Sequence, residues 1–308
     1  MGRFMIMLFA FLLLFKYPVE SLYSVAVLRH SISERFAMAV LDIISDDDRE
    51  WYEAQDWQEV ETRSYDGLKL AGYFLENEDP TENTAIVFHG FSSNHVMSVP
   101  YARMFSENGW NVLLIDQRSH GKSEGEYITY GYYERHDVGS WVDYVVEERG
   151  DDCVIALHGT SMGSASVLQY LGEYSKLNKL PKNVKVAISD CGYTSADEIF
   201  TQIMEEIIHL PQFLYMPAVE TMIEHYAEFK TDDVSSIDVV PYISIPVMFV
   251  HGDSDYFIPV EMGIRLYEAK NGDKKLYIAP GANHGLSFNS NPEEYERQAM
   301  EFVNEFVT

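Results

Sequence analysis

The sequence has only two cysteines and therefore little capacity for covalent crosslinks. Cys153 and Cys191 are expected near opposite ends of neighbouring strands. A disulfide requires Cα atoms within about 7 Å, whereas a strand of six residues already spans about 20 Å. Both are therefore predicted to be free thiols, which excludes a disulfide as a source of stability and gives no indication of a redox compartment.

Positive charge is also scarce. The 308 residues include 22 lysines and arginines against 49 aspartates and glutamates, a formal net charge of −27. Such a surface repels phosphate backbones and anionic lipid headgroups over about one Debye length. Nucleic acid is excluded as a partner, and we interpret the acidic excess as a solvated surface rather than as a site that recruits cations.

Long hydrophobic runs are absent except for one near the N-terminus. Phe4–Phe15 is an unbroken apolar run of twelve residues closed by Lys16. It is shorter than the roughly 20 residues of a membrane-spanning helix and suits the core of a signal peptide. Ser24–Ala26 has the small residues of a cleavage site, but it lies eight residues beyond Lys16 with Glu20 between, so an uncleaved anchor fits at least as well. Residues 1–28 are therefore predicted to be a hydrophobic signal or anchor segment.

This segment predicts a secreted or membrane-anchored protein that associates with a membrane through its N-terminus. The alternative is a hydrophobic helix packed on the following domain of a cytoplasmic protein. We assign residues 29–57 to an N-terminal helical lead-in and residues 58–308 to the main domain. The sequence contains 46% hydrophobic and 14% aromatic residues, which is ample for one buried core.

From Gln58 onward the pattern is strand, turn, strand, and then short strands that alternate with helices. Val60–Tyr65 and Leu68–Leu75 flank the turn Asp66-Gly67, which predicts an antiparallel hairpin. Six short apolar runs bounded by turn residues predict buried strands. This order indicates an α/β fold with a mostly parallel eight-stranded sheet and helices on both faces. The runs are 85–88, 112–115, 154–157, 184–188, 247–250 and 275–278, and the expected helices are 96–107, 132–147, 162–174, 260–269 and 292–306.

One interval is too long for a single crossover helix. Residues 192–243 contain two amphipathic stretches, Ser195–His209 and Ala218–Phe229, separated by Pro211 and Pro217. Because long connections in compact domains are uncommon unless they have a function, we predict a helical lid inserted over the sheet. Its apolar residues, Met204 and Met216 among them, either line an acyl pocket or only pack the insertion onto the body.

The motif that indicates chemistry is a G-x-S-x-G sequence, Gly159-Thr160-Ser161-Met162-Gly163. It directly follows a predicted buried strand and directly precedes a predicted helix. A serine in so sharp a turn is held at the carboxyl edge of the sheet, and the flanking glycines remove Cβ atoms that would clash there. We therefore predict that Ser161 is a nucleophile.

A serine nucleophile needs a base, and the chain has ten histidines. In a fold of this type the order along the chain is serine, acid, histidine, and the only histidine after His251 is His284, which follows the last predicted strand. His284 is the predicted base. His251 ends a strand and is interpreted as structural.

An acid is expected just past the strand 247–250, where the sequence offers Asp253 and Asp255. A carboxylate there accepts the second N–H of the histidine and stabilises the imidazolium that forms. Asp255 lies further into the loop and is favoured. The alternative is that His251, Asp253 and Asp255 bind a metal ion, but no further ligand cluster is evident, and we expect no metal and no cofactor.

The oxyanion that develops during acyl transfer needs two backbone donors. One is the N–H of Met162, next to the nucleophile, and the other is expected from the loop after the strand 85–88. His89-Gly90-Phe91 lies there, and the N–H of Phe91 is the predicted second donor. The side chains of His89 and Phe91 are interpreted as structural or as part of the pocket lining.

From about Glu59 to the C-terminus these residues resemble the α/β-hydrolase family, in its YqkD-like and Bem46-like branch. The landmarks are HGF at 89–91, DQRSHGKSEG at 116–125, HGTSMG at 158–163, SDCGYTS at 189–195, HGDSDYFIP at 251–259 and GANHG at 281–285. The resemblance implies that residues 58–308 form a hydrolase domain that cleaves carboxylic esters without a cofactor. It also favours Asp255, because the acid of this pattern lies four residues before the proline, here Pro259.

We therefore predict hydrolysis of small-molecule esters with short to medium acyl chains, through an acyl-serine intermediate. A thioesterase or a peptidase on the same residues is the alternative, although prolyl-oligopeptidase relatives have a large β-domain before the catalytic one and fewer than sixty residues precede this sheet. A non-enzymatic binding protein would lack one of the three catalytic residues, and none is missing. The oligomeric state is not indicated.

Overall fold

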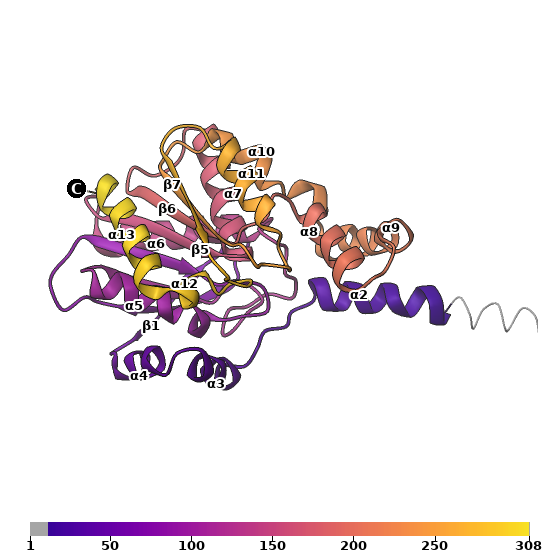
Figure 1. Ribbon diagram of the computed structural model, residues 1–308, viewed down its shortest axis with the longest axis horizontal. Helices are drawn as coiled ribbons and strands as arrows, with labels where there is room; N and C mark the ends of the chain where they lie inside the picture. Colours follow the sequence, from indigo (N-terminus) through magenta and orange to yellow (C-terminus); the bar gives the residue numbers. More distant parts are fainter. Residues whose placement is uncertain (1–11, 308) are drawn as a thin grey trace, which may run out of the picture.

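An eight-stranded sheet forms the centre of the computed structural model, which describes residues 12–307 (Figure 1). The strand order is β1-β2-β4-β3-β5-β6-β7-β8. β2 pairs antiparallel with both β1 and β4, and the other neighbours are parallel. The predicted hairpin and the predicted mostly parallel sheet are both confirmed. The strands are β1 Gln58–Arg63, β2 Lys69–Leu75, β3 Asn83–Phe88, β4 Asn111–Ile115, β5 Val154–Thr160, β6 Val184–Asp190, β7 Val247–Gly252 and β8 Lys274–Ala279.

Helices cover both faces of the sheet because alternate strand residues point to opposite sides. Ala85 and Val87 of β3 pack toward α5 and α13, whereas Ile86 and Phe88 pack toward α6, α7 and α11. The result is one sheet between two apolar layers. These helices are α5 Val99–Glu107, α6 Glu134–Arg149, α7 Met162–Lys176, α11 Val260–Ala269 and α13 Pro292–Val307, with the short α12 Ser287–Ser290 before α13.

The interval before the sheet is helical. Helices α3 (Glu34–Ile44) and α4 (Asp46–Ala54) lie against the face that α5 covers (Figure 1). Each begins at a serine whose hydroxyl accepts an N–H of the first turn, Ser33 from Phe36 and Ser45 from Asp48.

The insertion between β6 and β7 contains α8 (Ala196–Gln202) and α9 (Gln212–Met222), each extended by one π-helical turn, and then the short α10 (Ser236–Val239). Sequence reasoning used Pro217 as a helix boundary, and this was wrong, because Pro217 lies inside α9. A proline there removes one backbone hydrogen bond. Burial of Tyr215, Met216 and Val219 on the same helix offsets this loss.

Helix α2 (Tyr17–Val27) lies beside the lid helix α9, away from the sheet (Figure 1). Residues 1–11, which include most of the predicted signal or anchor run, lie outside the described part of the chain. Within residues 12–307, no helix has the length and apolar character needed to cross a membrane. Cys153 and Cys191 are buried free thiols, as expected from their predicted positions.

Candidate active site

Ser161 lies in a sharp turn between β5 and α7. Its backbone has φ 56° and ψ −115°, a conformation that a non-glycine residue adopts only when its surroundings enforce it. Close packing enforces it here: a Cβ at Gly159 would approach the Gly163 carbonyl oxygen to 2.4 Å, and one at Gly163 would approach that of Phe88 to 2.2 Å. The N–H of Ser161 also donates to the Asp190 carbonyl at 2.8 Å. These constraints hold the serine hydroxyl at the carboxyl edge of the sheet.

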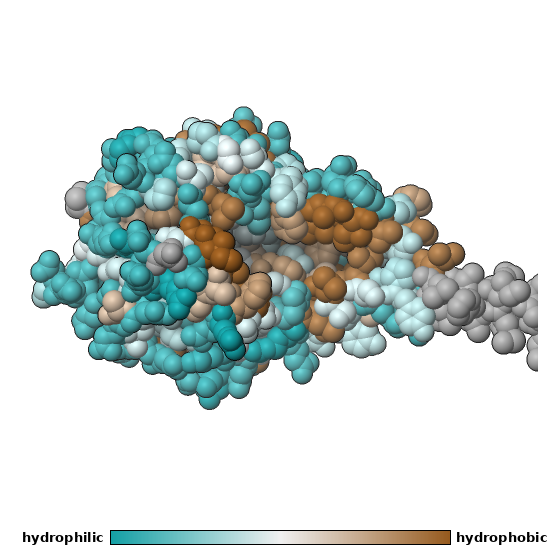
Figure 2. All heavy atoms as spheres, turned by 60° about the horizontal axis from the view of Figure 1, so that its bottom comes forward, coloured by the Kyte–Doolittle hydropathy of each residue, from teal (hydrophilic) through white to brown (hydrophobic). Residues whose placement is uncertain are grey.

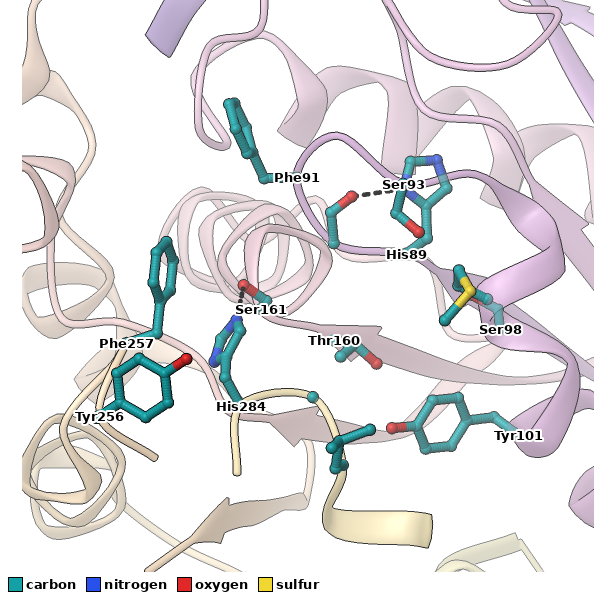
Figure 3. Close-up of a pocket in the computed structure, with 14 residues that line it drawn as sticks. His89, Phe91, Ser93, Ser98, Tyr101, Thr160, Ser161, Tyr256, Phe257 and His284 are labelled. Carbon is teal, nitrogen blue, oxygen red and sulfur yellow. Dashed lines mark hydrogen bonds between the residues drawn. The ribbon is translucent and has the colours of Figure 1, made fainter. Parts of the chain in front are cut away.

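The structure brings Ser161, His284 and Asp255 together from three separate loops. Ser161 Oγ lies 2.9 Å from His284 Nε2, and His284 Nδ1 lies 2.7 Å from Asp255 Oδ2 (Figure 3). Serine, imidazole and carboxylate therefore form one continuous chain of hydrogen bonds. Each of the three follows a strand, β5, β8 or β7, at the same edge of the sheet.

The carboxylate of Asp255 is fixed on both sides. Oδ1 accepts the backbone N–H groups of Phe257 at 2.9 Å and Ile258 at 2.8 Å, which leaves Oδ2 to face His284. Burial alone would raise the pKa of Asp255, but hydrogen bonds from His251 and His284, with the charge of His284 and the Ile258 N–H, lower it to about 2. Asp255 is therefore ionised throughout the neutral range.

Sequence reasoning singled out two further residues here, His251 at the end of β7 and Asp253 in the loop after it. His251 is fully buried; its Nε2 donates to the Ile258 carbonyl at 2.8 Å and lies 3.4 Å from Asp255 Oδ2. Asp253 Oδ1 instead accepts the N–H of Gly281 at 2.7 Å, from the loop after β8. Asp253 therefore does not join His251 and Asp255 in a common site, and it connects the two loops that carry Asp255 and His284.

Another trio of potential metal ligands, Cys191, Asp255 and His284, has its ligand atoms within 4.8 Å of one another. Burial raises the pKa of the Cys191 thiol well above its usual value, so this group remains protonated and is a poor ligand. Asp255 and His284 already bind each other. The donor set therefore fits the hydrogen-bonded arrangement better than a metal site.

The two predicted oxyanion donors lie on either side of the serine. Met162 is the first residue of α7, so its N–H has no partner within the helix. Phe91 lies in the loop after β3, and this loop runs close to the serine: a Cβ at Gly90 would lie 3.4 Å from Ser161 Cβ.

His89 orients the peptide that contains the Phe91 N–H. Its Nε2 accepts the backbone N–H of Gln117 at 3.0 Å, so its proton lies on Nδ1, which donates to the Gly90 carbonyl at 2.7 Å. Because a trans peptide directs its C=O and N–H to opposite sides, this bond also sets the direction of the Phe91 N–H. Burial lowers the pKa of His89 to about 4, which keeps this tautomer neutral.

A second buried histidine supports the same loop, and sequence reasoning missed it. His120 Nε2 accepts the N–H of Ser92 at 3.1 Å, and its Nδ1 donates to the Arg118 carbonyl at 2.8 Å. Burial lowers the pKa of His120 to about 3. The available signal was that His120-Gly121 is one of five His-Gly pairs in the sequence and, like His89-Gly90, follows a strand.

A cavity of about 400 Å³ opens above Ser161 and His284. The ring of Phe257 lies on one side of the serine, with Phe91 nearby, and Thr160 and Tyr101 lie on the other side (Figure 3). Among the described residues, no aspartate or glutamate lines this cavity. Its walls are made of His89, Gly90, Phe91, Ser93, Met97, Ser98, Tyr101, Thr160, Ser161, Tyr256, Phe257, His284, Gly285 and Leu286.

A second cavity, of about 240 Å³, lies under the lid and is almost wholly apolar. Met204 and Met216, the two residues predicted from the sequence to line an acyl pocket, both contribute to its wall and are buried. Phe91 and Phe257 line this cavity as well as the one above Ser161. These two rings therefore form a wall that the two cavities share.

Comparison with known proteins places this arrangement among hydrolases. Residues 79–188 match a family described as serine aminopeptidase, S33. YqkD of Bacillus subtilis is 32% identical over 238 residues, which are 77% of this chain and 76% of YqkD. Bem46 of Schizosaccharomyces pombe is 24% identical over 235 residues, 74% of this chain and 71% of Bem46. Among solved structures, the Pyrococcus furiosus esterase Pf2001 matches with a TM-score of 0.66 and 25% identity, over 83% of this chain and 93% of that one.

Proposed function

Because this chain belongs to the α/β-hydrolase family, in the branch of YqkD and Bem46, we propose that it hydrolyses carboxylic esters through an acyl-serine intermediate. The observation that supports this most directly is the chain of hydrogen bonds from Ser161 through His284 to Asp255. It ends at a cavity large enough for a small-molecule ester. No metal or cofactor enters the proposed reaction.

In the proposed first step, Ser161 Oγ attacks the ester carbonyl carbon while its proton passes to His284 Nε2, 2.9 Å away. The carbonyl oxygen becomes an oxyanion that the N–H groups of Phe91 and Met162 stabilise. The tetrahedral intermediate collapses, the C–O bond to the alcohol breaks, and His284 gives its proton to the departing oxygen. Water then attacks the acyl-serine with His284 as base again, which releases the acid.

Asp255 is proposed to hold His284 in the tautomer that this sequence of steps needs. Its Oδ2 accepts the Nδ1–H, so Nε2 is free to accept the serine proton. The low pKa of Asp255 keeps the negative charge in place when the imidazolium forms.

A serine peptidase is the alternative, and the description of the family that matches residues 79–188 favours it. An aminopeptidase must recognise the ammonium group of its substrate, for which a carboxylate is the usual partner. Within the part of the chain that the structure describes, no carboxylate lines the cavity above Ser161, and the matched structure Pf2001 is an esterase. Both observations support an ester substrate.

One panel of substrates tests the proposal. The purified chain should react with a fluorophosphonate probe and hydrolyse p-nitrophenyl esters, with much slower release from aminoacyl p-nitroanilides. A thioester series with the same acyl groups distinguishes the thioesterase alternative. Faster turnover of the anilides than of the esters would show that the protein is a peptidase. Absence of both labelling and turnover would refute the proposed hydrolysis.

If the lid cavity holds the acyl chain, a polar side chain in its wall should penalise long acyl groups selectively. We expect Met204→Gln to lower kcat/KM for octanoate about tenfold more than for acetate, because each buried methylene contributes about 0.8 kcal/mol. Met222→Gln is the matched control, since Met222 lies on the lid but not in this cavity wall. An equal loss along the acyl series would assign Met204 to packing alone.

A further inference from the structure

Helix α2 forms part of the wall of the apolar cavity under the lid. Leu22, Val25 and Ala26 face this cavity from α2, opposite the lid residues Met204 and Met216. Figure 2 shows apolar residues gathered at the end of the molecule where α2 and the lid lie together. Without α2 the cavity would be open on this side.

The helix is held firmly in this position. Val19, Tyr23 and Val27, spaced four residues apart on one face of α2, are buried in the same apolar cluster as the lid. The Tyr130 hydroxyl donates to the Ala26 carbonyl at 2.8 Å, and the Ile128 N–H donates to the Val27 carbonyl at 2.7 Å. The wall that α2 contributes is therefore fixed to the body of the domain.

Two aromatic rings stand between this cavity and the serine. Phe257 lies 5.1 Å from the His284 ring, centroid to centroid, and Phe91 stacks on Tyr130 at 5.4 Å. Tyr130 lines the lid cavity, and its hydroxyl also donates to the Ala26 carbonyl of α2. A group attached to a carbonyl at Ser161 and passing between Phe91 and Phe257 would reach Leu22, Val25 and Ala26.

We propose that α2 is a specificity-determining wall of the acyl subsite, and that this subsite takes an aliphatic acyl chain. The proposal rests on the esterase function proposed above. An apolar chain fits because the lining offers almost no polar atom. The acyl arm is assigned here, rather than the alcohol, because it stays bonded to Ser161 through both steps, whereas the alcohol must leave through the more polar cavity that Ser93, Ser98 and Tyr256 line.

One consequence concerns processing of the N-terminus. Removal of the chain up to Ala26 would take away all three α2 residues that line the cavity. The proposal therefore requires that the mature protein retain α2. The intact mass of the protein purified from its source cells should include residues 22–26, and a mature protein that begins after Ala26 would overturn the proposal.

The test uses the full chain with the cavity narrowed from α2. Ala26→Phe should lower kcat/KM for p-nitrophenyl octanoate at least tenfold while acetate turnover changes less than twofold. Ser24→Phe, the same enlargement on an exposed residue of α2 outside the cavity wall, should leave the whole series unchanged. Equal behaviour of the two variants would overturn the proposal.

A second pair of variants covers the case in which Ala26→Phe fails to fold. Val25 is 67% exposed, so Val25→Asp should be tolerated, and a carboxylate at the cavity wall should again reduce octanoate turnover selectively. Ser24→Asp is the matched control, because it adds the same charge at the neighbouring position, outside the cavity wall. A series of alkyl acetates of increasing alcohol length tests whether the cavity holds the alcohol instead. If Val25→Asp slows the longer alkyl acetates and leaves the acyl series unchanged, the cavity binds the alcohol and the acyl assignment is wrong.

The outcomes separate this proposal from the esterase proposal itself. Acetate turnover and fluorophosphonate labelling in the unmodified protein report on the reaction, whereas the ratio of octanoate to acetate turnover reports on α2. If the unmodified protein shows neither acetate turnover nor fluorophosphonate labelling, the proposed ester hydrolysis is refuted. An unchanged ratio in both α2 variants, with acetate turnover intact, refutes only the role of α2.

Discussion

Replacement of Ser161 by alanine should abolish ester turnover and fluorophosphonate labelling, with a loss of about 10⁴-fold or more in kcat. The proposed reaction forms its covalent bond at Ser161 Oγ, the atom that alanine lacks. The fold should be retained, because the hydroxyl contributes one hydrogen bond to a partly exposed imidazole. Activity assays and thermal unfolding on the same preparation measure both effects.

A neighbouring serine provides the matched control. Ser164 is buried on α7, one turn from the proposed nucleophile, and its Oγ lies 2.6 Å from that of Ser189. Ser164→Ala should cost about 1 kcal/mol of stability and leave turnover within a few-fold of normal. Near-normal activity of a pure Ser161→Ala preparation, free of contaminating esterase, would remove Ser161 from the mechanism.

Most of the sheet was predictable because its inner strands are short and buried on both faces. Runs such as Ala85–Phe88 and Val247–Val250 are apolar throughout and end at turn residues, so their type is fixed locally. The candidate site followed from the same strands. Ser161, Asp255 and His284 each come just after a parallel strand, and the carboxyl ends of parallel strands meet at one edge of the sheet.

The lid and α2 were harder to predict because tertiary packing decides them. Pro217 favours a break by its local chemistry, yet buried neighbours keep it inside α9. The position of α2 depends on contacts with the lid helix α9, about two hundred residues away in the sequence. The turn just before α2 is held in the same way, by a hydrogen bond from the Tyr215 hydroxyl to the Leu14 carbonyl at 3.1 Å. No local pattern encodes such a contact. Most of the apolar run Phe4–Phe15 lies outside the described residues, so its role as a signal, an anchor or a packed helix stays a prediction.

Replacing Asp255 or Asp253 by asparagine should have different effects, which distinguishes the roles of the two residues. In Asp255→Asn the carbonyl oxygen should keep the two N–H groups of Phe257 and Ile258, which places the NH₂ group opposite His284 Nδ1. That arrangement stabilises the tautomer protonated on Nε2, which cannot accept the proton of Ser161. We therefore expect kcat to fall roughly 10⁴-fold while the protein still folds.

Asp253→Asn is the matched control, the same change two residues earlier in the same loop. Its carbonyl oxygen can still accept the Gly281 N–H, now without the strength that a charge adds, so stability should fall by about 1 kcal/mol and kcat should change little. Steady-state kinetics and urea unfolding of both purified variants give the comparison. If Asp253→Asn lost activity and Asp255→Asn kept it, Asp253 would be the acid, and the loop would have to rearrange to bring its carboxylate from Gly281 to His284.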